Sequence, residues 1–165
     1  MLKDIRAFFD VRDILEVETP LLASAGNTDP HIESLKTLFR NQEHYLNTSP
    51  EFAMKRLLAA GSGDIYQVCK AFRDGEAGNM HNPEFTILEW YRVGFDHYKL
   101  MDEMDEFLHC ILNTKKSKRI TYQNLFQTYL NIDPLTATTT ELQQLAATKN
   151  LGNLAGLERD GWLNI

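Results

Sequence analysis

The chain has 165 residues, a length that suits one domain with one sizeable core. Its net charge is −6, and its one dense basic cluster, residues 115–119, is typical of a solvated helix end, so a large nucleic-acid footprint is not favoured. No apolar run is long enough to span a bilayer, and residues 1–10 have the pattern of an amphipathic helix rather than of a secretory signal.

The two cysteines, Cys69 and Cys110, lack the spacing of metal ligands and do not indicate a disulfide framework. We therefore expect a cytoplasmic protein, because reducing conditions keep thiols free. We assign no metal-ligating residue within the chain.

In chain order, the first predicted elements are a helix over residues 2–12 and a short strand over residues 14–17, which Pro20 stops. Composition then indicates three further segments: a loop over 23–30 and strands over 35–39 and 45–47.

A second helix is expected to begin near Thr48 or Ser49, because either hydroxyl can cap its first turn. Pro50 suits that turn, and Glu51 lies near the positive end of the helix. The glycines of residues 61–63 end the helix.

Residues 65–72 and 85–93 predict two strands, and the long polar loop between them makes an antiparallel hairpin with an enlarged tip. Helical periodicity then covers residues 98–112, 122–130 and 140–149. Together these elements predict an α+β fold in which an antiparallel sheet is flanked by helices.

The second strand of the hairpin carries the first candidate site. Because strand side chains alternate, Phe85, Ile87, Glu89 and Tyr91 share one face. Burying Glu89 without a partner would be costly, so its carboxylate is either solvated or placed to receive a cation. Phe85 either packs in the core or offers a flat ring on which a base could stack.

Three segments resemble the class II lysyl-tRNA synthetase group, in the same order and with similar spacing. Residues 15–20 (LEVETP) resemble motif 1, and residues 48–58 (TSPEFAMKRLL) resemble the segment that lines the amino-acid pocket. Residues 72–73 (FR), 81–86 (HNPEFT) and 88–91 (LEWY) resemble motif 2. The resemblance implies a class II synthetase-like catalytic domain over residues 1–165, with motif 1 at about 2–20, motif 2 at about 68–92 and a helical insertion at about 97–165.

A subgroup is also indicated. Residues 28–29, 54–61 and 89–92 are more similar to the paralogous ligases that attach β-lysine to elongation factor P than to true lysyl-tRNA synthetases. This similarity implies elongation factor P as the acceptor, and it makes tRNA an unexpected partner.

The family resemblance implies that ATP and a lysine-like amino acid form an aminoacyl-adenylate. Arg73 would be the catalytic arginine on the α-phosphate, and the other implied ATP-binding residues are Asp74, Gly75, Glu76, His81, Asn82 and Phe85. The implied substrate-binding residues are Ser49, Pro50, Glu51, Glu89 and Tyr91. Mg²⁺ would accompany ATP, with most of its ligands beyond residue 165.

Plainer interpretations of these residues stay open. Arg73 could form a surface ion pair with Asp74 or Glu76. Glu51 could act only on the helix dipole.

The chain departs from the family pattern at two places. Gly75 stands where motif 2 has a glutamate, so either Asp74 or Glu76 takes over that contact or the contact is lost. Motif 3, a glycine-rich segment with a second ATP-binding arginine, is not found in the sequence. We therefore expect a truncated chain with an incomplete catalytic core that is inactive alone.

Two other functions stay open. The first is a shortened lysyl-tRNA synthetase. The second is a non-catalytic fragment that acts by dimerising through residues 2–20, the segment from which we expect a homodimer.

Overall fold

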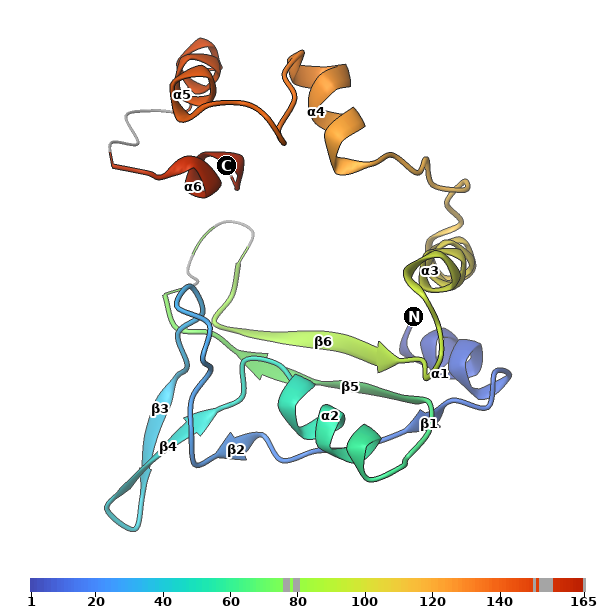
Figure 1. Ribbon diagram of the computed structural model, residues 1–165. Helices are drawn as coiled ribbons and strands as arrows, with labels where there is room; N and C mark the ends of the chain where they lie inside the picture. Colours follow the sequence, from blue (N-terminus) through green and yellow to red (C-terminus); the bar gives the residue numbers. More distant parts are fainter. Residues whose placement is uncertain (76–77, 79–80, 150, 152–155, 165) are drawn as a thin grey trace. The chain divides into compact units, whose positions relative to one another are not determined.

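The computed structural model describes residues 1–75, 78, 81–149, 151 and 156–164 (Figure 1). The chain divides into two compact units, Met1–Lys116 and Ser117–Ile165. The first unit contains α1 (Leu2–Asp10), β1 (Leu15–Glu16), β2 (Leu22–Ala23), β3 (Lys36–Phe39), β4 (Gln42–Leu46), α2 (Glu51–Ala59), β5 (Ile65–Phe72), β6 (Glu84–Tyr91) and α3 (His97–Leu112). The second contains α4 (Tyr122–Leu130), α5 (Thr139–Thr148) and α6 (Arg159–Leu163).

The first unit is built on the predicted hairpin. Strands β5 and β6 pair antiparallel, from Ile65 opposite Tyr91 to Phe72 opposite Glu84. Strand β1 pairs with the start of β5 in parallel, so this sheet is mixed rather than antiparallel throughout. The prediction was wrong on this point because a strand's periodicity does not indicate the direction in which it pairs with a distant strand.

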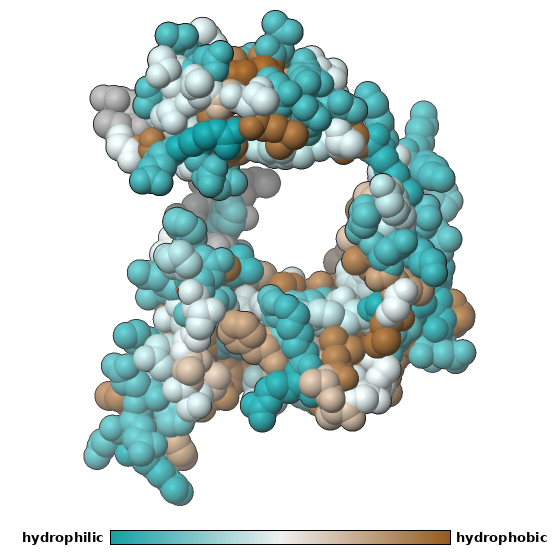
Figure 2. Space-filling model, in the orientation of Figure 1, coloured by the Kyte–Doolittle hydropathy of each residue, from teal (hydrophilic) through white to brown (hydrophobic). Residues whose placement is uncertain are grey.

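A second sheet, in the order β2-β4-β3, is antiparallel. Arg40 and Asn41 join β3 to β4 with φ angles of 52° and 60°, the left-handed conformation that a type I′ hairpin turn requires at both positions. Figure 2 shows this tip, at the lower left, as a hydrophilic surface. Strand β2 was not predicted, since its two residues lie at the edge of the expected loop over 23–30.

Helices α1 and α3 and one face of the hairpin enclose the apolar core. Phe9 is fully buried, and its ring stacks on that of Tyr66 with 4.3 Å between centroids. Phe107 of α3 joins this cluster, against which the alternate residues Val68, Leu88 and Trp90 pack. The opposite face of β5 and β6 carries the paired residues Gln67 and Glu89, with Ile87 beside them.

A buried polar cluster fixes α3 to the end of β6. The guanidinium of Arg92 forms ion pairs with Asp64 at 2.9 Å and with Glu103 at 3.2 Å. The indole Nε1 of Trp90 donates to the other oxygen of Glu103 at 3.1 Å. Because the side chains of Arg92 and Glu103 are only 12% and 6% exposed, loss of either partner would leave a charge in a poorly solvated place.

The second unit is a small set of helices. Helix α5 begins with a capping box in which Thr138 and Glu141 exchange hydrogen bonds, and these bonds lower the pKa of Glu141. Helix α6 was not predicted because it has five residues, too few for a clear period. Within the described part of the chain, no helix has both the length and the apolar character needed to cross a bilayer.

We expect Glu103→Gln to lower the free energy of unfolding of the first unit by about 3 kcal/mol, because it leaves the Arg92 charge with one partner fewer in a buried setting. Urea unfolding followed by Trp90 fluorescence, with Trp162 replaced by Phe in every protein compared, measures this unit alone. Glu106→Gln is the control, since that carboxylate is 62% exposed and its pair with Arg12 is worth less than about 1 kcal/mol. Equal losses for the two variants would contradict the prediction.

Candidate functional site

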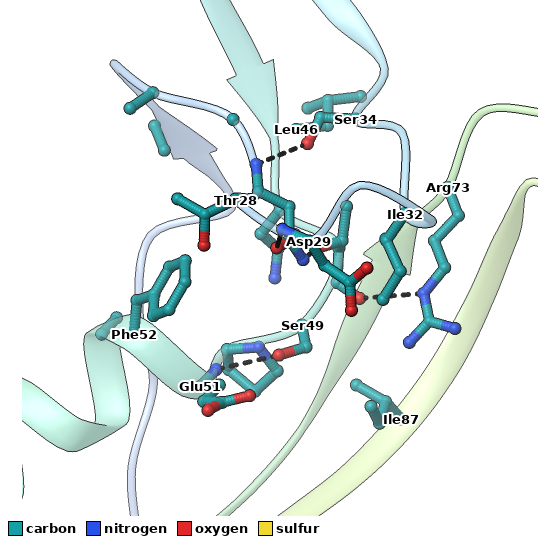
Figure 3. Close-up of a pocket in the computed structure, with 18 of the residues that line it drawn as sticks. Thr28, Asp29, Ile32, Ser34, Leu46, Ser49, Glu51, Phe52, Arg73 and Ile87 are labelled. Atoms are coloured by element: carbon teal, nitrogen blue, oxygen red, sulfur yellow. Dashed lines mark hydrogen bonds between the residues drawn. The ribbon is translucent and has the colours of Figure 1, made fainter. Parts of the chain in front are cut away.

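Three segments surround one cavity of about 630 Å³ (Figure 3). The cavity loop, residues 24–34, forms one wall, and the junction of β4 with α2, residues 46–53, forms the second. Arg73, Ile87 and Glu89 form the third. The predicted residues that line this cavity are Ser49, Pro50, Glu51, Arg73 and Glu89.

Thr48 connects these walls. Its side chain is buried, and its hydroxyl accepts a hydrogen bond from Asn27 Nδ2 at 2.6 Å. Its carbonyl accepts from Arg73 Nε at 3.4 Å, a long contact (Figure 3). The preceding carbonyl, that of Asn47, accepts from the Phe72 amide at 2.9 Å. The cavity loop and the end of β5 are thus held to the same point of the backbone.

The start of α2 places Glu51 at the cavity. The helix begins at Glu51 with Pro50 as its N-cap, so the prediction that Thr48 or Ser49 would be the N-cap was wrong. The Ser49 hydroxyl still accepts from the Glu51 amide at 3.1 Å, and Pro50 has no amide that needs a partner. Glu51 does more than face the helix dipole, because it lines the cavity and forms an ion pair of 2.5 Å with Lys55.

The sheet wall has the alternation that the sequence predicted. Ile87 and Glu89 both line the cavity, whereas the intervening Leu88 packs against the core. Tyr91 does not line the cavity, but its hydroxyl donates to Glu89 at 2.5 Å. Burial, and then this hydrogen bond and the charge of Glu89, raise the pKa of Tyr91 well above its usual range. Tyr91 therefore stays a neutral donor that keeps the Glu89 carboxylate in place.

Arg73 lies at the far side of the cavity from α2. Its guanidinium carbon is 5.0 Å from the centroid of the Phe85 ring, within the range of a cation–π contact. Phe85 is half-buried and does not line the cavity. Phe85 therefore contacts Arg73, which lines the cavity, but does not line the cavity itself.

Four of the other predicted ATP-binding residues, Asp74, Gly75, His81 and Asn82, do not line the cavity. Asp74 pairs with Glu33 of the cavity loop through the backbone, and its carboxylate accepts from the Gly75 amide at 2.8 Å. His81 and Asn82 are exposed, and Glu76 lies outside the described residues. Gly75 has a φ of 75°, a conformation that favours glycine over the glutamate expected there. The ATP roles of these residues stay predictions.

The cavity loop contributes residues that sequence reasoning did not assign to the site. Asn27, Thr28 and Asp29 all line the cavity. Asn27 Oδ1 accepts from the Asp29 amide and Asp29 Oδ1 from the His31 amide, both at 2.8 Å. These short-range turns were detectable from the Asn and Asp spacing. Their position over α2 was not, because it depends on the long-range bond to Thr48.

A metal centre is not indicated by the side chains that the structure describes, since no three His, Cys, Asp or Glu residues among them lie where they could share an ion.

We expect Glu89→Gln to lower the pKa of Tyr91 but to leave it above the usual value of about 10, because burial is the larger cause of the rise and remains. NMR of tyrosine labelled at its ζ carbon measures this pKa. Since the folded-state pKa is raised, the stabilising contribution of Tyr91 is complete below pH of about 10 and is lost as the pH rises above that value.

Glu51→Gln serves as the control for this titration, because the charge of Glu51 is the smallest contribution to the pKa of Tyr91. An unchanged pKa of Tyr91 in Glu89→Gln, or a larger fall in Glu51→Gln, would contradict the arrangement described.

Comparison with known proteins connects the chain to one family. Residues 1–156 match the family model described as tRNA synthetases class II (D, K and N). The elongation factor P–(R)-β-lysine ligase of Pseudoalteromonas translucida is 54% identical over 161 residues, which cover 94% of this chain and 50% of that protein. The ligase of the same name from Vibrio cholerae is 51% identical over 166 residues, covering 97% of this chain and 51% of that protein.

The chain spans about half the length of the curated relatives it matches. The family model nevertheless covers nearly all of its residues, and the hairpin that carries Arg73 and Glu89 lies within the matched range. The chain therefore belongs to the class II tRNA synthetase family of the D, K and N type.

Proposed function

We propose that this chain supplies the amino-acid cavity of an ATP-dependent ligase that attaches (R)-β-lysine to a lysine of elongation factor P. The observation that carries the proposal is the convergence of Glu51, Glu89 and Arg73 on one cavity. Two kinds of support agree with it: the names of the relatives at about 50% identity, and the chemistry of the cavity wall.

The reaction proposed has two steps. The carboxylate of the amino acid attacks the α-phosphorus of ATP, which gives an aminoacyl-adenylate and releases pyrophosphate. The amine of the acceptor lysine then attacks the carbonyl of the adenylate, and AMP leaves. Neither step uses a protein nucleophile, so the protein's contribution is to position the reactants and to neutralise charge.

Arg73 would bind the α-phosphate. Its guanidinium has a fixed fork of donors that suits phosphate oxygens, and it lines the cavity that holds the amino acid. Phe85 lies under this guanidinium and could stack on the adenine, with His81 and Asn82 further along the hairpin. Asp74, Gly75 and Glu76 would complete the same end of the ATP site.

Glu51 and Glu89 would bind the ammonium groups of the substrate, with Ser49 and Pro50 shaping the wall beside Glu51. A cation removed from water needs an anionic partner, and Tyr91 holds the Glu89 carboxylate in place for this by donating one hydrogen bond to its Oε1. Mg²⁺ is expected to accompany ATP, but no set of three suitable ligands lies among the described side chains, so we assign no step to it.

The second candidate is a lysyl-tRNA synthetase, which uses the same first step. The net charge of −6 disfavours it, because tRNA binding rewards clustered Lys and Arg.

A non-catalytic role through dimerisation of residues 2–20 is a third candidate. It is supported by exposed apolar side chains of that segment, Leu2, Val11 and Leu15. A homodimer is compatible with the ligase as well. Two cysteines without a disulfide fit the reducing cytoplasm.

The acceptor distinguishes these functions. We expect a protein in which residues 1–165 replace the matching segment of the Vibrio cholerae ligase to transfer labelled (R)-β-lysine to elongation factor P when ATP is present. Arg73→Ala should slow transfer by about 100-fold or more, because one donor to the transition-state charge is lost. Arg40→Ala, at the exposed turn of β3 and β4, is the matched control.

Label on tRNA but not on elongation factor P would overturn the proposed acceptor. Transfer that is unaffected by Arg73→Ala would overturn the role of this arginine.

We expect the 165-residue chain on its own to give no ATP–pyrophosphate exchange. Among the described residues that line the cavity, Arg73 is the only cation, whereas a triphosphate carries several negative charges. The assay uses labelled pyrophosphate with L-lysine or (R)-β-lysine. Exchange well above the level of the Arg73→Ala chain would show that this single cation suffices.

A further inference from the structure

Negatively charged side chains outnumber positively charged ones among the described residues that line the cavity. Three carboxylates line it, those of Asp29, Glu51 and Glu89, and Arg73 is the one guanidinium among the described lining residues. Sequence reasoning assigned Glu51 and Glu89 to the substrate and gave Asp29 no role. In Figure 3 the side chain of Asp29 points from the cavity loop into the part of the cavity between Glu51 and Arg73.

The three carboxylates differ in their partners. Glu51 already forms an ion pair with Lys55 on the same helix, at 2.5 Å. Glu89 accepts from the neutral hydroxyl of Tyr91, and Asp29 accepts from the backbone amide of His31. Within the described part of the chain, neither Asp29 nor Glu89 has a Lys, Arg or His at ion-pair distance. Neither carboxylate is therefore paired with a basic side chain of the described residues, and each can accept an ammonium group of a ligand.

Asp29 is also held in place before any ligand arrives. Its amide donates to Asn27 Oδ1, and Asn27 Nδ2 donates to Thr48, which fixes the turn to the start of α2. The Asn27 amide in turn donates to the Ser34 hydroxyl at 3.0 Å, which closes the base of the loop (Figure 3). A preformed contact of this kind loses little conformational entropy on binding.

We propose that Asp29 is a substrate-selecting residue that shares with Glu51 the binding of one ammonium group of the amino acid, while Glu89 binds the other. The carboxylates of Asp29 and Glu89 come from different walls, the cavity loop and the sheet, so a substrate with two separated ammonium groups is the one that can reach both. This selects diamino acids over amino acids with one amine. The inference rests on the proposed function, since it names a further residue that determines the substrate of that cavity.

Isothermal titration calorimetry of the 165-residue chain with (R)-β-lysine and with L-lysine tests this. Asp29→Asn keeps the oxygen that accepts from the His31 amide, so the turn is retained and only the charge is lost. We expect this variant to bind the preferred amino acid about tenfold more weakly, the usual effect of losing a hydrogen bond between charged groups. Asp29→Glu, which restores the charge, should bind more tightly than Asp29→Asn.

Glu33→Gln is the matched control. Glu33 is an exposed acid of the same loop that does not line the cavity, so its loss changes the net charge equally and should alter the dissociation constant by less than about twofold. Circular dichroism and the thermal midpoint establish that each variant is folded.

The outcomes separate the two proposals. If the unaltered chain binds neither amino acid, the proposed function of the cavity fails and the inference fails with it. If the unaltered chain binds and Asp29→Asn binds as tightly, or Glu33→Gln weakens binding as much, the role of Asp29 alone is overturned.

Discussion

The alternation of side chains along β6 is the constraint on which the rest of the structure depends. Leu88 and Trp90 face the helices and take part in the core, so Ile87 and Glu89 must face the cavity. A shift of one residue in the pairing with β5 would bury Glu89 among aromatic rings and expose Trp90. The same packing that stabilises the first unit therefore determines where the carboxylate lies.

The buried cluster around Arg92 and Glu103 strengthens this constraint. It holds Trp90 and Arg92 on the helical side, and each is the immediate chain neighbour of a residue of the Glu89–Tyr91 pair. A displacement of the strand would have to separate buried ion pairs first. Thr48 joins the three walls, since it lies at the junction of β4 with α2 and both the cavity loop and Arg73 bond to it. The site is thus placed by two sets of contacts, the buried ion pairs behind β6 and the hydrogen bonds of Thr48 within the cavity wall.

Local sequence signals predicted most of the framework. The bounds of β5 and α4 were predicted without error, and the face shared by Ile87 and Glu89 followed from a period of two. The predictions that failed, or were not made, concern long-range contacts. The parallel pairing of β1, the short strand β2 and the position of the cavity loop depend on contacts between residues far apart in the chain. Asp29 was missed for this reason, because its turn is local but its place at the cavity is not.

The three carboxylates that line the cavity repel one another, and this repulsion bears on function. Like charges around one cavity repel each other, and the repulsion is stronger near half-buried groups such as Glu89 than in water. Packing and hydrogen bonds elsewhere must offset it, as the neutral donor Tyr91 and the backbone amide of His31 do here. A diamino acid would weaken this repulsion on binding, because it would place two positive charges among the carboxylates. A substrate with one amine would relieve less of it, and in this way the distribution of charge on the walls can select the substrate.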